Sequence, residues 1–394
     1  MNCIIKKKAE NYKTVIIYGI GVYGRRCYFD MIDSGKSNAD ILLAVTRPND
    51  NQQFHGLNIH KLSALLQYRE DALVIVAVSD KYKDEMVDYA KGLGFQNVYS
   101  PMIKLNDYDC IKSNPDIDIK KEIANWYEVY TGKSIDLDHP KTFNEKIQWL
   151  KLYDSTQLKG TLSDKYLVRD YVRNVIGGQY LVPLCGVWNS FDEIDFGQLP
   201  EKFVLKCTHG SGTNEIIDLK DSIEYSALKE KFQSWIRINY AYACGLEMHY
   251  QYITPKIIAE EYLQTSDGSD LRDYKVHVFD GQAKLIQVDI DRMHNHRRNL
   301  YTREWEYIPC SILYPTAPEV QVERPKCLAE LIRVSELLAK GFIYVRTDFY
   351  IVGSHIYFGE MTFTHGSGVE PFIPETFNME MGSWIHLPGE KEGK

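Results

Sequence analysis

Two β-rich runs near the C-terminal end of the sequence place the tightest limit on how this chain can fold. They cover residues 345–352 and 356–363, and a Gly-Ser-His stretch at 353–355 joins them. Runs of this kind separated by a short glycine-containing turn predict a β-hairpin. A three-residue loop sets the expected register, with Val352 opposite Ile356.

The expected register gathers polar side chains on one face of this hairpin. Side chains in a strand alternate between two faces, so Asp348 lies opposite Glu360 and Arg346 lies opposite Thr362. Like charges that face each other destabilise a ladder. A cation shared by the two carboxylates reverses that effect, and Mg²⁺ prefers such oxygen ligands. A solvated face on an edge hairpin is the alternative, and a two-residue turn would move Glu360 to the other face.

The bulk properties of the sequence are those of a globular protein with two or three domains. It has 394 residues, of which 44% are hydrophobic and 25% are charged. The net charge of −8 argues against a nucleic-acid partner. Its eight cysteines form no CxxC pair, which is usual in a reducing compartment. No apolar run reaches the ~18 residues of a spanning helix. We expect a cytoplasmic protein, with peripheral association at the inner face of the membrane left open.

The first part of the sequence, residues 1–104, has the pattern of a Rossmann-like α/β domain. Strand and helix patterns alternate along it, which predicts a parallel sheet. Gly19, Gly21 and Gly24 follow the first strand with GxGxxG spacing, which suits a nucleotide-linked ligand at a helix N-terminus. Arg47 stands where a ribose-binding acid is expected, so the glycines serve either such a ligand or only a tight turn.

A helical connector over residues 105–139 leads to a second domain over residues 140–394. Helices open this domain, and Ser163 is a good N-cap for a helix at 164–175. Strands then dominate, and their pattern predicts an α+β fold with largely antiparallel pairing. We expect no internal repeat.

Two strand ends in the second domain carry groups suited to a nucleotide. Lys206 closes a strand, and the small-residue loop at 209–212 can offer backbone N–H groups to phosphate oxygens. An ordinary hairpin turn is the alternative for this loop. Glu260 and Glu261 end an apolar strand whose following backbone could bind an adenine edge, and an edge strand with exposed acids is the alternative.

A basic stretch between residues 289 and 298 contains the arginines Arg292, Arg297 and Arg298. Arginine presents a planar set of N–H groups that matches a carboxylate or a phosphate. The stretch therefore predicts a loop that binds such a group, and a solvated loop is the alternative.

The order of these parts, rather than any one of them, resembles the ATP-grasp fold. From about residue 140 to residue 388 the sequence is similar to the TupA-like ATP-grasp family of teichuronopeptide biosynthesis. The stretches that carry the resemblance are 142–151 (TFNEKIQWLK), 163–166 (SDKY), 203–209 (FVLKCTH), 257–262 (IIAEEY), 273–275 (DYK) and 357–363 (YFGEMTF). Residues 1–104 lie outside it.

This resemblance implies ATP and Mg²⁺ as cofactors and a role for each matched residue. The groups implied to bind ATP are Lys165 and Lys206 at the α- and β-phosphates, His209, Gly210, Ser211 and Gly212 over the β- and γ-phosphates, Glu260, Glu261 and Leu263 around the adenine, and Asp273 at the ribose. The groups implied in catalysis are Arg346, Lys206 and Lys275. Those implied to hold Mg²⁺ are Asp348, Glu360 and Thr362, and many ATP-grasp ligases carry Asn where this chain has Thr362.

The resemblance also implies a reaction. ATP-grasp enzymes mostly activate a carboxylate as an acylphosphate and join it to an amine, while Mg²⁺ and cationic side chains neutralise the accumulating charge. The expected substrates are a sugar carboxylate such as a uronic acid, held by Arg292, Arg297 or Arg298, and an amino acid or other amine. The implied setting is the biosynthesis of a bacterial capsule, O-antigen or other cell-surface polysaccharide. A glycan-acting transferase (glycosyltransferase or phosphotransferase) and a non-catalytic nucleotide-binding scaffold are the alternatives.

Overall fold

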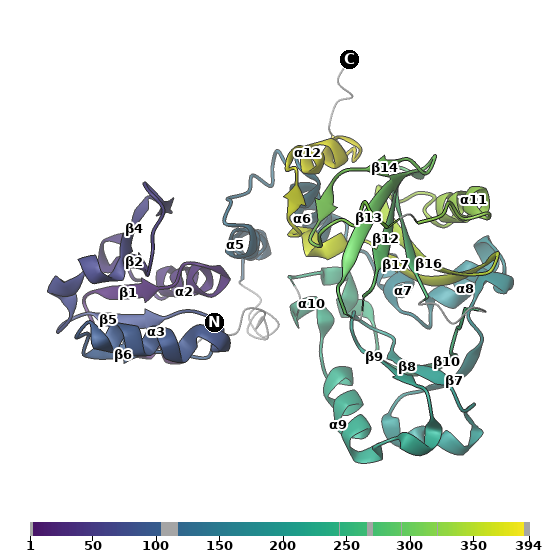
Figure 1. Ribbon diagram of the computed structural model, residues 1–394, viewed down its shortest axis with the longest axis horizontal. Coiled ribbons are helices and arrows are strands. Elements are labelled where there is room, and N and C mark those ends of the chain that lie inside the picture. Colours follow the sequence, from purple (N-terminus) through teal and green to yellow (C-terminus); the bar gives the residue numbers. More distant parts are fainter. Residues whose placement is uncertain are drawn as a thin grey trace. The chain divides into compact units, whose positions relative to one another are not determined.

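The computed structural model describes residues 3–103, 117–243, 245–265, 271–292, 294–320 and 322–389. The chain divides into two compact units, Met1–Ile135 and Asp136–Lys394 (Figure 1). Residues 105–116 of the expected connector lie outside the described residues. The helix that follows them, α5 (Ile119–Thr131), belongs to the first unit.

The first unit is a six-stranded sheet flanked by helices. The strand order is β3-β4-β2-β1-β5-β6, and each pair except β3–β4 is parallel. The strands are β1 (Val15–Tyr18), β2 (Ile41–Val45), β3 (Gln53–Phe54), β4 (Leu57–Lys61), β5 (Leu73–Val76) and β6 (Asn97–Tyr99). The helices are α1 (Cys3–Ala9), α2 (Val22–Asp33), α3 (Asp80–Gly92) and α5, with 3-10 turns at Asn38–Asp40, Leu62–Ala64 and Leu66–Tyr68. The predicted Rossmann-like parallel sheet is confirmed.

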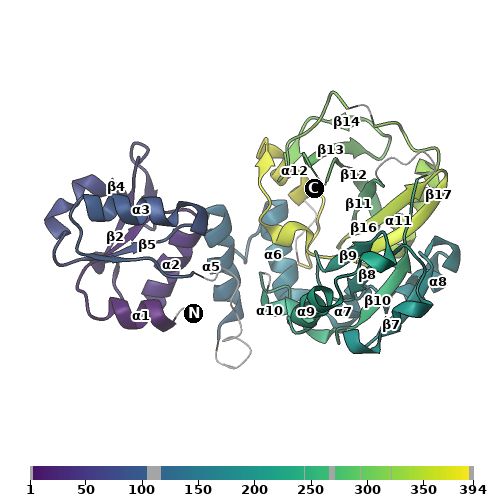
Figure 2. The same cartoon turned by 60° about the horizontal axis from the view of Figure 1, so that its bottom comes forward.

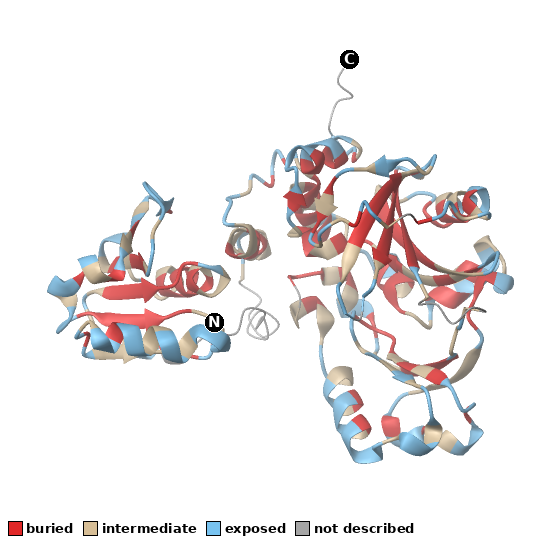
Figure 3. Cartoon of the chain, in the orientation of Figure 1, coloured by how far each residue is buried: buried red, intermediate tan, exposed pale blue. Residues whose placement is uncertain are grey.

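The two central strands of this sheet, β1 and β5, are apolar on both faces. Each is buried along its whole length (Figure 3). In β1, Val15 and Ile17 pack into one core cluster, and Ile16 and Tyr18 pack into a second cluster on the other face. Strands that are buried on both faces have continuous hydrophobic sequences, which is why the sequence identified them.

The second unit contains a small antiparallel sheet with the strand order β7-β10-β8-β9. Its strands are β7 (Leu184–Trp188), β8 (Phe203–Cys207), β9 (Asn214–Ile217) and β10 (Ile257–Glu261). Helix α9 (Tyr225–Ile236) packs on this sheet, because its Phe232 belongs to the same core cluster as Phe203 and Ala259.

A larger antiparallel sheet, ordered β14-β13-β12-β11-β16-β17, completes the framework of the second unit (Figure 2). Its strands are β11 (Asp273–Phe279), β12 (Gln282–Ile290), β13 (Arg297–Thr302), β14 (Tyr307–Ile308), β16 (Tyr344–Val352) and β17 (His355–Thr362), and a separate pair joins β15 (Ser311–Ile312) to β18 (Phe372–Ile373). The remaining helices are α6 (Phe143–Tyr153), α7 (Gln157–Ser163), α8 (Val168–Val175), α10 (Tyr240–Ala243), α11 (Leu328–Leu338) and α12 (Thr376–Ser383). Short 3-10 turns are η4 (Gly178–Tyr180), η5 (Phe191–Glu193), η6 (Phe196–Gln198), η7 (Lys220–Ser222), η8 (Met248–Tyr252) and η9 (His365–Gly368). The predicted antiparallel α+β arrangement is confirmed.

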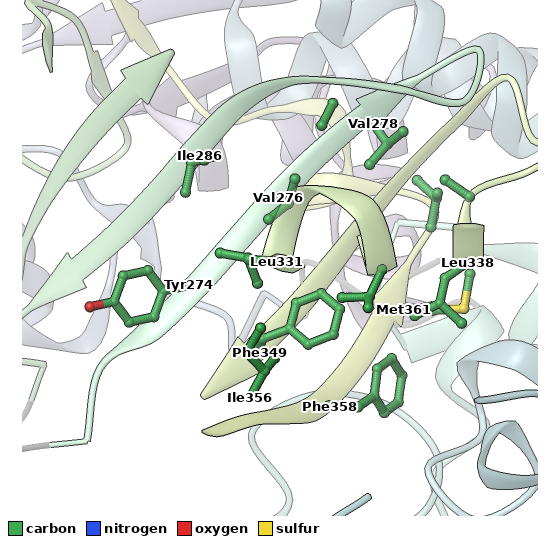
Figure 4. Packing of buried hydrophobic residues seen from close by; sticks show 14 of the residues in the cluster. Tyr274, Val276, Val278, Ile286, Leu331, Leu338, Phe349, Ile356, Phe358 and Met361 are labelled. Atoms are coloured by element: carbon green, nitrogen blue, oxygen red, sulfur yellow. The ribbon is translucent and has the colours of Figure 1, made fainter. Parts of the chain in front are cut away.

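The larger sheet separates an apolar core from a polar face. On the apolar face, Val276, Phe349 and Met361 pack with Leu331 and Leu338 of α11 (Figure 4). Alternation along the strands sends the charged residues of β11, β12, β16 and β17 to the opposite face. The apolar packing therefore fixes the strands on which the charged groups stand.

Helix α6 begins at a capping box. The Thr142 hydroxyl accepts from the Glu145 N–H at 3.2 Å, and the Glu145 carboxylate accepts from the Thr142 N–H at 2.9 Å. The helix places Gln148 and Lys151 on a fully buried face.

The predicted cap at Ser163 is wrong. Ser163 is the last residue of α7, and the next helix, α8, begins only at Val168. The neighbouring Asp164 supplies the acceptor instead, since its Oδ1 receives the backbone N–H groups of Tyr166 and Leu167 at 2.8 and 2.9 Å. The carboxylate at the adjacent position therefore stabilises the turn that precedes α8, and α8 itself has no side-chain cap.

Candidate active site

The hairpin of β16 and β17 has a shorter turn than the sequence predicts. Val352 pairs with His355, so the turn contains only residues 353 and 354, and the predicted three-residue loop is wrong. The left-handed conformation of Gly353 (φ +64°) permits this tight reversal. By itself, a turn one residue shorter would carry Glu360 to the core face of the sheet.

A β-bulge at Gly359 restores the predicted pairing. Phe358 pairs with Phe349, but the next pair joins Glu360 to Asp348, which leaves Gly359 as an extra residue. A Cβ atom on Gly359 would lie 3.1 Å from the backbone oxygen of Asp348, so the strand approaches too closely there for a side chain.

Arg346 is the centre of a group of four side chains on the polar face of the hairpin. Its Nε and Nη2 atoms donate to the two carboxylate oxygens of Asp348, both at 2.7 Å. Nη2 also lies 3.1 Å from Glu360 Oε1 and 3.1 Å from Thr362 Oγ1. The cation that the two facing carboxylates share is therefore a guanidinium of the chain itself.

Charge compensation keeps Asp348 ionised although it is buried. Burial alone would raise its pKa, but Arg346 and Lys275 hold the pKa of this carboxyl well below its usual range. Burial would lower the pKa of the Arg346 guanidinium, and Asp348 raises it above its ordinary value. Both members of the pair therefore remain charged.

The oxygen atoms of this group fit Mg²⁺. Asp348 and Glu360 offer carboxylate oxygens, and Thr362 offers a hydroxyl. Glu360 Oε2 lies 3.8 Å from Lys165 Nζ, and its other oxygen accepts from Arg346. Within the described part of the chain, no group of three or more His, Cys, Asp or Glu side chains could hold a metal ion. Two carboxylates suit a cation that takes its other ligands from phosphate or water.

Lys275 links the hairpin to the middle of the sheet. Its Nζ donates to Asp348 Oδ2 and Asp273 Oδ2, both at 3.1 Å, and lies 3.9 Å from Asp289 Oδ2. Burial lowers the pKa of Lys275, but Asp348 and Asp273 raise it above its ordinary value. Arg292 also pairs with Asp273. The predicted ribose ligand Asp273 is therefore already bound by two cations.

The side chains of the three arginines predicted to bind the acceptor do not point to a common site. Arg297 and Arg298 are consecutive in β13, so their side chains point to opposite faces. Arg297 pairs at 3.3 Å with Glu319, whose side chain is exposed. Arg298 is buried, and Arg292 is bound to Asp273.

Arg298 is balanced by two carboxylates. Its Nε donates to Asp289 Oδ1 at 2.8 Å, and its Nη1 donates to Glu370 Oε2 at 3.1 Å. Burial raises the pKa of Asp289, but Arg298 and Lys275 lower it to about 2. Arg298 is therefore an internal counter-ion rather than a free cation.

On the small sheet, Glu260 is held between two cations. Lys206 Nζ donates to Glu260 Oε2 at 2.7 Å, and Arg169 Nη1 donates to Oε1 at 2.7 Å. Arg169 is itself fixed, because its Nη2 donates to the backbone oxygen of Val182 at 2.7 Å. Arg169 was missed by the sequence analysis, since it precedes Glu260 by 91 positions and no local pattern links them.

The other predicted nucleotide contacts lie around the end of β10 and in the loop after β8. Glu261 is exposed, and its N–H donates to the backbone oxygen of Pro183 at 3.0 Å. Leu263 is half-buried, and Ser211 and Gly212 are exposed at the tip of the loop.

Lys165 connects the small sheet to the hairpin. Its Nζ donates to the backbone oxygen of Gly210 at 2.6 Å and lies 3.8 Å from Glu360 Oε2. Its own N–H donates to the backbone oxygen of Thr208 at 2.9 Å. The loop at 209–212 and the paired carboxylates therefore meet at one lysine.

His209 is a buried member of this loop. Its Nε2 lies 3.2 Å from the backbone oxygen of Trp235, which can only accept, so Nε2 carries the proton. Burial lowers the pKa of His209, which keeps the ring neutral. A Cβ atom on the neighbouring Gly210 would lie 2.3 Å from the ring of Tyr240, so this position also requires glycine.

The pentapeptide Thr-His-Gly-Ser-Gly occurs twice, so the expectation of no internal repeat is wrong. The first copy, residues 208–212, forms the loop after β8, and the second copy, residues 364–368, follows β17 and includes η9. The second copy was missed as part of the site, although the repetition itself was a signal that could have found it. His365 Nδ1 lies 2.7 Å from Arg346 Nη1, which brings the second copy to the hairpin charges.

Helix α6 holds the second copy in place. Lys151 Nζ donates to the Ser367 backbone oxygen at 2.6 Å and to its hydroxyl at 2.7 Å. Gln148 Nε2 donates to the backbone oxygens of Ser367 and Gly368, both at 2.9 Å. Side chains from a helix far away in the sequence therefore bind this segment directly.

In the first unit, packing explains two of the three glycines predicted to bind a nucleotide. A Cβ atom on Gly19 would lie 2.6 Å from Val78 Cγ1, and one on Gly24 would lie 1.8 Å from the Gly19 oxygen. A Cβ atom on Gly21 would have no neighbouring heavy atom within 4 Å. Close approach of helix and strand accounts for Gly19 and Gly24, whereas Gly21 leaves room beside the start of α2.

None of the helices in the described part of the chain combines the length and the apolar character needed to cross a membrane.

Comparison with known proteins gives one family match. The model of a family described as TupA-like ATPgrasp matches residues 145–386, which is well over half of the chain. A comparison with curated protein sequences gives no match.

Several solved structures are loosely similar. D-alanine–D-alanine ligase from Bacillus anthracis complexed with ATP has 11% identity and a TM-score of 0.33, with 94% of each chain covered. N5-carboxyaminoimidazole ribonucleotide synthetase from Thermus thermophilus has 11% identity and a TM-score of 0.29, with 89% of this chain and 71% of that chain covered. The ATP-grasp ligase PsnB complexed with minimal precursor has 11% identity and a TM-score of 0.31, with 94% and 99% covered. At these scores the family assignment rests on the sequence match alone.

Proposed function

Because the chain belongs to the TupA-like ATP-grasp family, we propose that it is an ATP-dependent carboxylate–amine ligase. The proposed substrates are a sugar carboxylate, such as a uronic acid, and an amino acid or other amine, in the biosynthesis of a bacterial cell-surface polysaccharide. The observation that carries the proposal is the position of Lys165, which contacts both Gly210 in the loop of the small sheet and Glu360 of the hairpin. Phosphates bound by that loop would lie against the facing carboxylates.

In the proposed complex, cations from both sheets surround the phosphates of ATP. Lys165 and Lys206 would bind the α- and β-phosphates, the loop at 209–212 would cover the β- and γ-phosphates, and Arg346 would stabilise the transferring phosphoryl group. Lys206 is bonded to Glu260 without the nucleotide, so ATP has to compete with this ion pair. Because breaking the Lys206–Glu260 ion pair costs free energy, a ligand with several negative charges competes for Lys206 better than a weakly charged one.

Asp348 and Glu360, with Thr362 beside them, would hold Mg²⁺, which neutralises charge on the phosphates when it is bound. Arg346 Nη2 donates to one oxygen of each carboxylate and contributes a positive charge beside them in its own right. The raised pKa of Lys275 keeps that side chain protonated, so it contributes charge to the site rather than acting as a base.

The proposed reaction has two steps. An oxygen of the acceptor carboxylate bonds to the γ-phosphorus while the bond to the β,γ-bridging oxygen breaks, which releases ADP and leaves an acylphosphate. The amine nitrogen then bonds to the acyl carbon, the bond from that carbon to the phosphate oxygen breaks, and the nitrogen loses a proton to solvent. The products are an amide, ADP and phosphate.

A phosphotransferase acting on a glycan hydroxyl is the second candidate. It is favoured by the ion pairs of the arginines, because Arg298 is balanced by Asp289 and Glu370 and Arg292 is bound to Asp273. A hydroxyl acceptor needs no cation of its own, whereas a carboxylate acceptor has to displace one of these partners.

The test is to incubate the protein with ATP, Mg²⁺, candidate uronic-acid glycans and a pool of amino acids, and to measure nucleotide products and glycan masses. The ligase predicts ADP release that depends on both a carboxylate and an amine, and a mass gain of one amine less one water. A stable phosphate on the glycan without an amide selects the phosphotransferase, and release of AMP contradicts both.

Two variants test the non-catalytic alternative. Asp348→Asn and Glu360→Gln should lose ATP turnover while they keep the wild-type circular dichroism spectrum. Wild-type protein that binds ATP but never turns it over with any acceptor would favour a scaffold.

A further inference from the structure

His365 has a defined hydrogen-bonding state. A guanidinium can only donate, so the 2.7 Å contact between Arg346 Nη1 and His365 Nδ1 makes Nδ1 an acceptor. The other ring nitrogen, Nε2, lies 3.1 Å from Glu370 Oε2. Burial raises the pKa of Glu370, but His365 and Arg298 lower it to about 2, so this carboxylate is ionised. The proton of the neutral ring is therefore on Nε2.

The contact with His365 decides which N–H of Arg346 remains available. Arginine has five N–H groups, and those on Nε and Nη2 are directed to Asp348, Glu360 and Thr362. One N–H of Nη1 goes to His365. The second N–H of Nη1 has no acceptor in the part of the chain that the structure describes.

Close contacts hold Glu370 and the backbone next to His365 in place. Glu370 Oε2 accepts from Arg298 Nη1 at 3.1 Å and lies 3.1 Å from His365 Nε2. A Cβ atom on Gly366 would lie 2.3 Å from Glu370 Cγ, and one on Gly368 would lie 2.5 Å from Gln148 Nε2. The two glycines of the second pentapeptide therefore allow the close packing that brings His365 between Arg346 and Glu370.

We propose that His365 is a positioning residue for Arg346. By accepting from one N–H of Nη1, it holds the guanidinium in a single orientation and keeps the other N–H of Nη1 for an oxygen of the transferring phosphoryl group. The donation from Arg346 to Nδ1 fixes the tautomer of His365, and Arg298 holds the carboxylate of Glu370 beside the protonated Nε2. This inference rests on the proposed phosphoryl transfer from ATP, and it gives the second pentapeptide a role that differs from phosphate binding.

Three variants of His365 separate its two contacts. In His365→Asn the amide oxygen replaces Nδ1 as the acceptor for Arg346, whereas in His365→Gln the longer amide reaches the position of Nε2 beside Glu370. His365→Phe removes both contacts. Losing a hydrogen bond to a charged group lowers a rate by about 10- to 100-fold. We expect that loss in kcat for the Gln and Phe variants, with the KM for ATP changed by less than about threefold, and rescue of most of the rate in the Asn variant.

A matched control uses a histidine outside the site. His386 pairs with Asp280 on the surface, and His386→Asn and His386→Phe should keep the wild-type rate. Thermal unfolding of all variants identifies any loss of rate that comes from misfolding. A folded His365→Phe variant with kcat within about twofold of wild type overturns the proposal, as does an Asn variant as slow as the Phe variant.

The tautomer provides a readout that does not depend on turnover. Nitrogen-15 NMR of the histidine side chains should show neutral rings with the proton on Nε2 for both His209 and His365, and the signal of His365 is identified by its absence from His365→Asn. A proton on Nδ1 overturns the proposal whatever the activity. If wild-type protein consumes no ATP with any acceptor while the Nε2–H tautomer is present, the proposed function fails and the contact geometry stands.

Discussion

The two copies of Thr-His-Gly-Ser-Gly have the same five residues and different surroundings. In the first copy, residues 208–212, the tip formed by Ser211 and Gly212 is exposed. In the second copy, residues 364–368, Lys151 and Gln148 bind the backbone and His365 binds Arg346. A short sequence therefore sets which conformations are available, and the residues packed against it set what it does.

The two histidines show the same contrast. His209 donates through Nε2 to the backbone oxygen of Trp235, so its ring supports its own loop. His365 uses both ring nitrogens and lies between Arg346 and Glu370. The first copy leaves the backbone of its tip exposed, and the second copy holds the side chain of Arg346.

The largest effect should come from removing the lysine behind the second copy. Lys151 is fully buried and donates to Ser367 and to the Gly245 oxygen, so Lys151→Met leaves buried acceptors without a donor. We expect the free energy of unfolding of the second unit to fall by about 4 kcal/mol. Urea denaturation followed by tryptophan fluorescence measures it, because five of the six tryptophans lie in this unit: Trp149, Trp188, Trp235, Trp305 and Trp384.

The control for this variant lies beside the first copy. Lys231 is half-exposed and pairs with Glu215 of β9, and an exposed ion pair contributes little. Lys231→Met should change the free energy of unfolding by less than about 0.5 kcal/mol. If Lys151→Met and Lys231→Met lowered the free energy of unfolding equally, the inferred difference between the surroundings of the two copies would be contradicted.

The matched glycines should show an intermediate effect. Gly368 and Gly212 are the fifth residues of the two copies, with φ of +68° and +72°. A Cβ atom on Gly368 would also lie 2.9 Å from Ile147 and 3.0 Å from the Asn144 oxygen, whereas one on Gly212 meets nothing within 4 Å. Gly368→Ala should cost about 3 kcal/mol and Gly212→Ala about 1 kcal/mol, because both strain the left-handed backbone and only the former is overpacked.

These two variants share a single change of side chain, so the same urea titration compares them directly. A cost for Gly212→Ala as large as that for Gly368→Ala would mean that backbone conformation, and not packing, distinguishes these positions.

The smallest effect should appear as a difference in acid sensitivity. The pKa of Glu370 is lowered from 4.5 to about 2 in the folded protein, so this group adds stability above pH 4.5 that is lost as the pH falls toward 2. Glu370→Gln should therefore lose less stability than wild type over that interval, by on the order of 2 kcal/mol. Urea denaturation at a series of pH values measures the difference.

The partly exposed carboxylate of Glu215, close to the first copy in the sequence, supplies the comparison for Glu370. Glu215→Gln removes only a surface ion pair, so its acid dependence should follow that of wild type. Parallel acid curves for Glu370→Gln and wild type would show that Glu370 contributes no such stability.

Local patterns predicted the framework of both units. The alternation of strand and helix patterns over residues 1–104 indicated a parallel sheet, and the strand-rich pattern after residue 140 indicated largely antiparallel pairing. These features depend on residues within a few positions of one another, so a single sequence contains them.

Local patterns could not predict the ion pairs of the site. Arg169 and Glu260 are 91 positions apart, and Arg298 and Glu370 are 72 positions apart. Their pairing follows from the tertiary fold, which brings separate strands and loops together. As a result, arginines predicted to bind a substrate are in ion pairs, and His365 was missed although the same residues, His-Gly-Ser-Gly, had been noted as a loop at 209–212.

With the turn and the bulge at Gly359 in place, the face on which Glu360 lies depends on whether the number of residues between Asp348 and Glu360 is odd or even. The turn lacks one residue and the strand gains one, so the two offsets cancel between Asp348 and Glu360. Deleting a single residue of β17 before Gly359 would exchange the two faces of the second strand. Glu360 and Thr362 would then point into the hydrophobic core, and Met361 would lie on the polar face. Deleting two residues of β17 before Gly359 would leave the side chains on their present faces, but Glu360 would then no longer lie opposite Asp348.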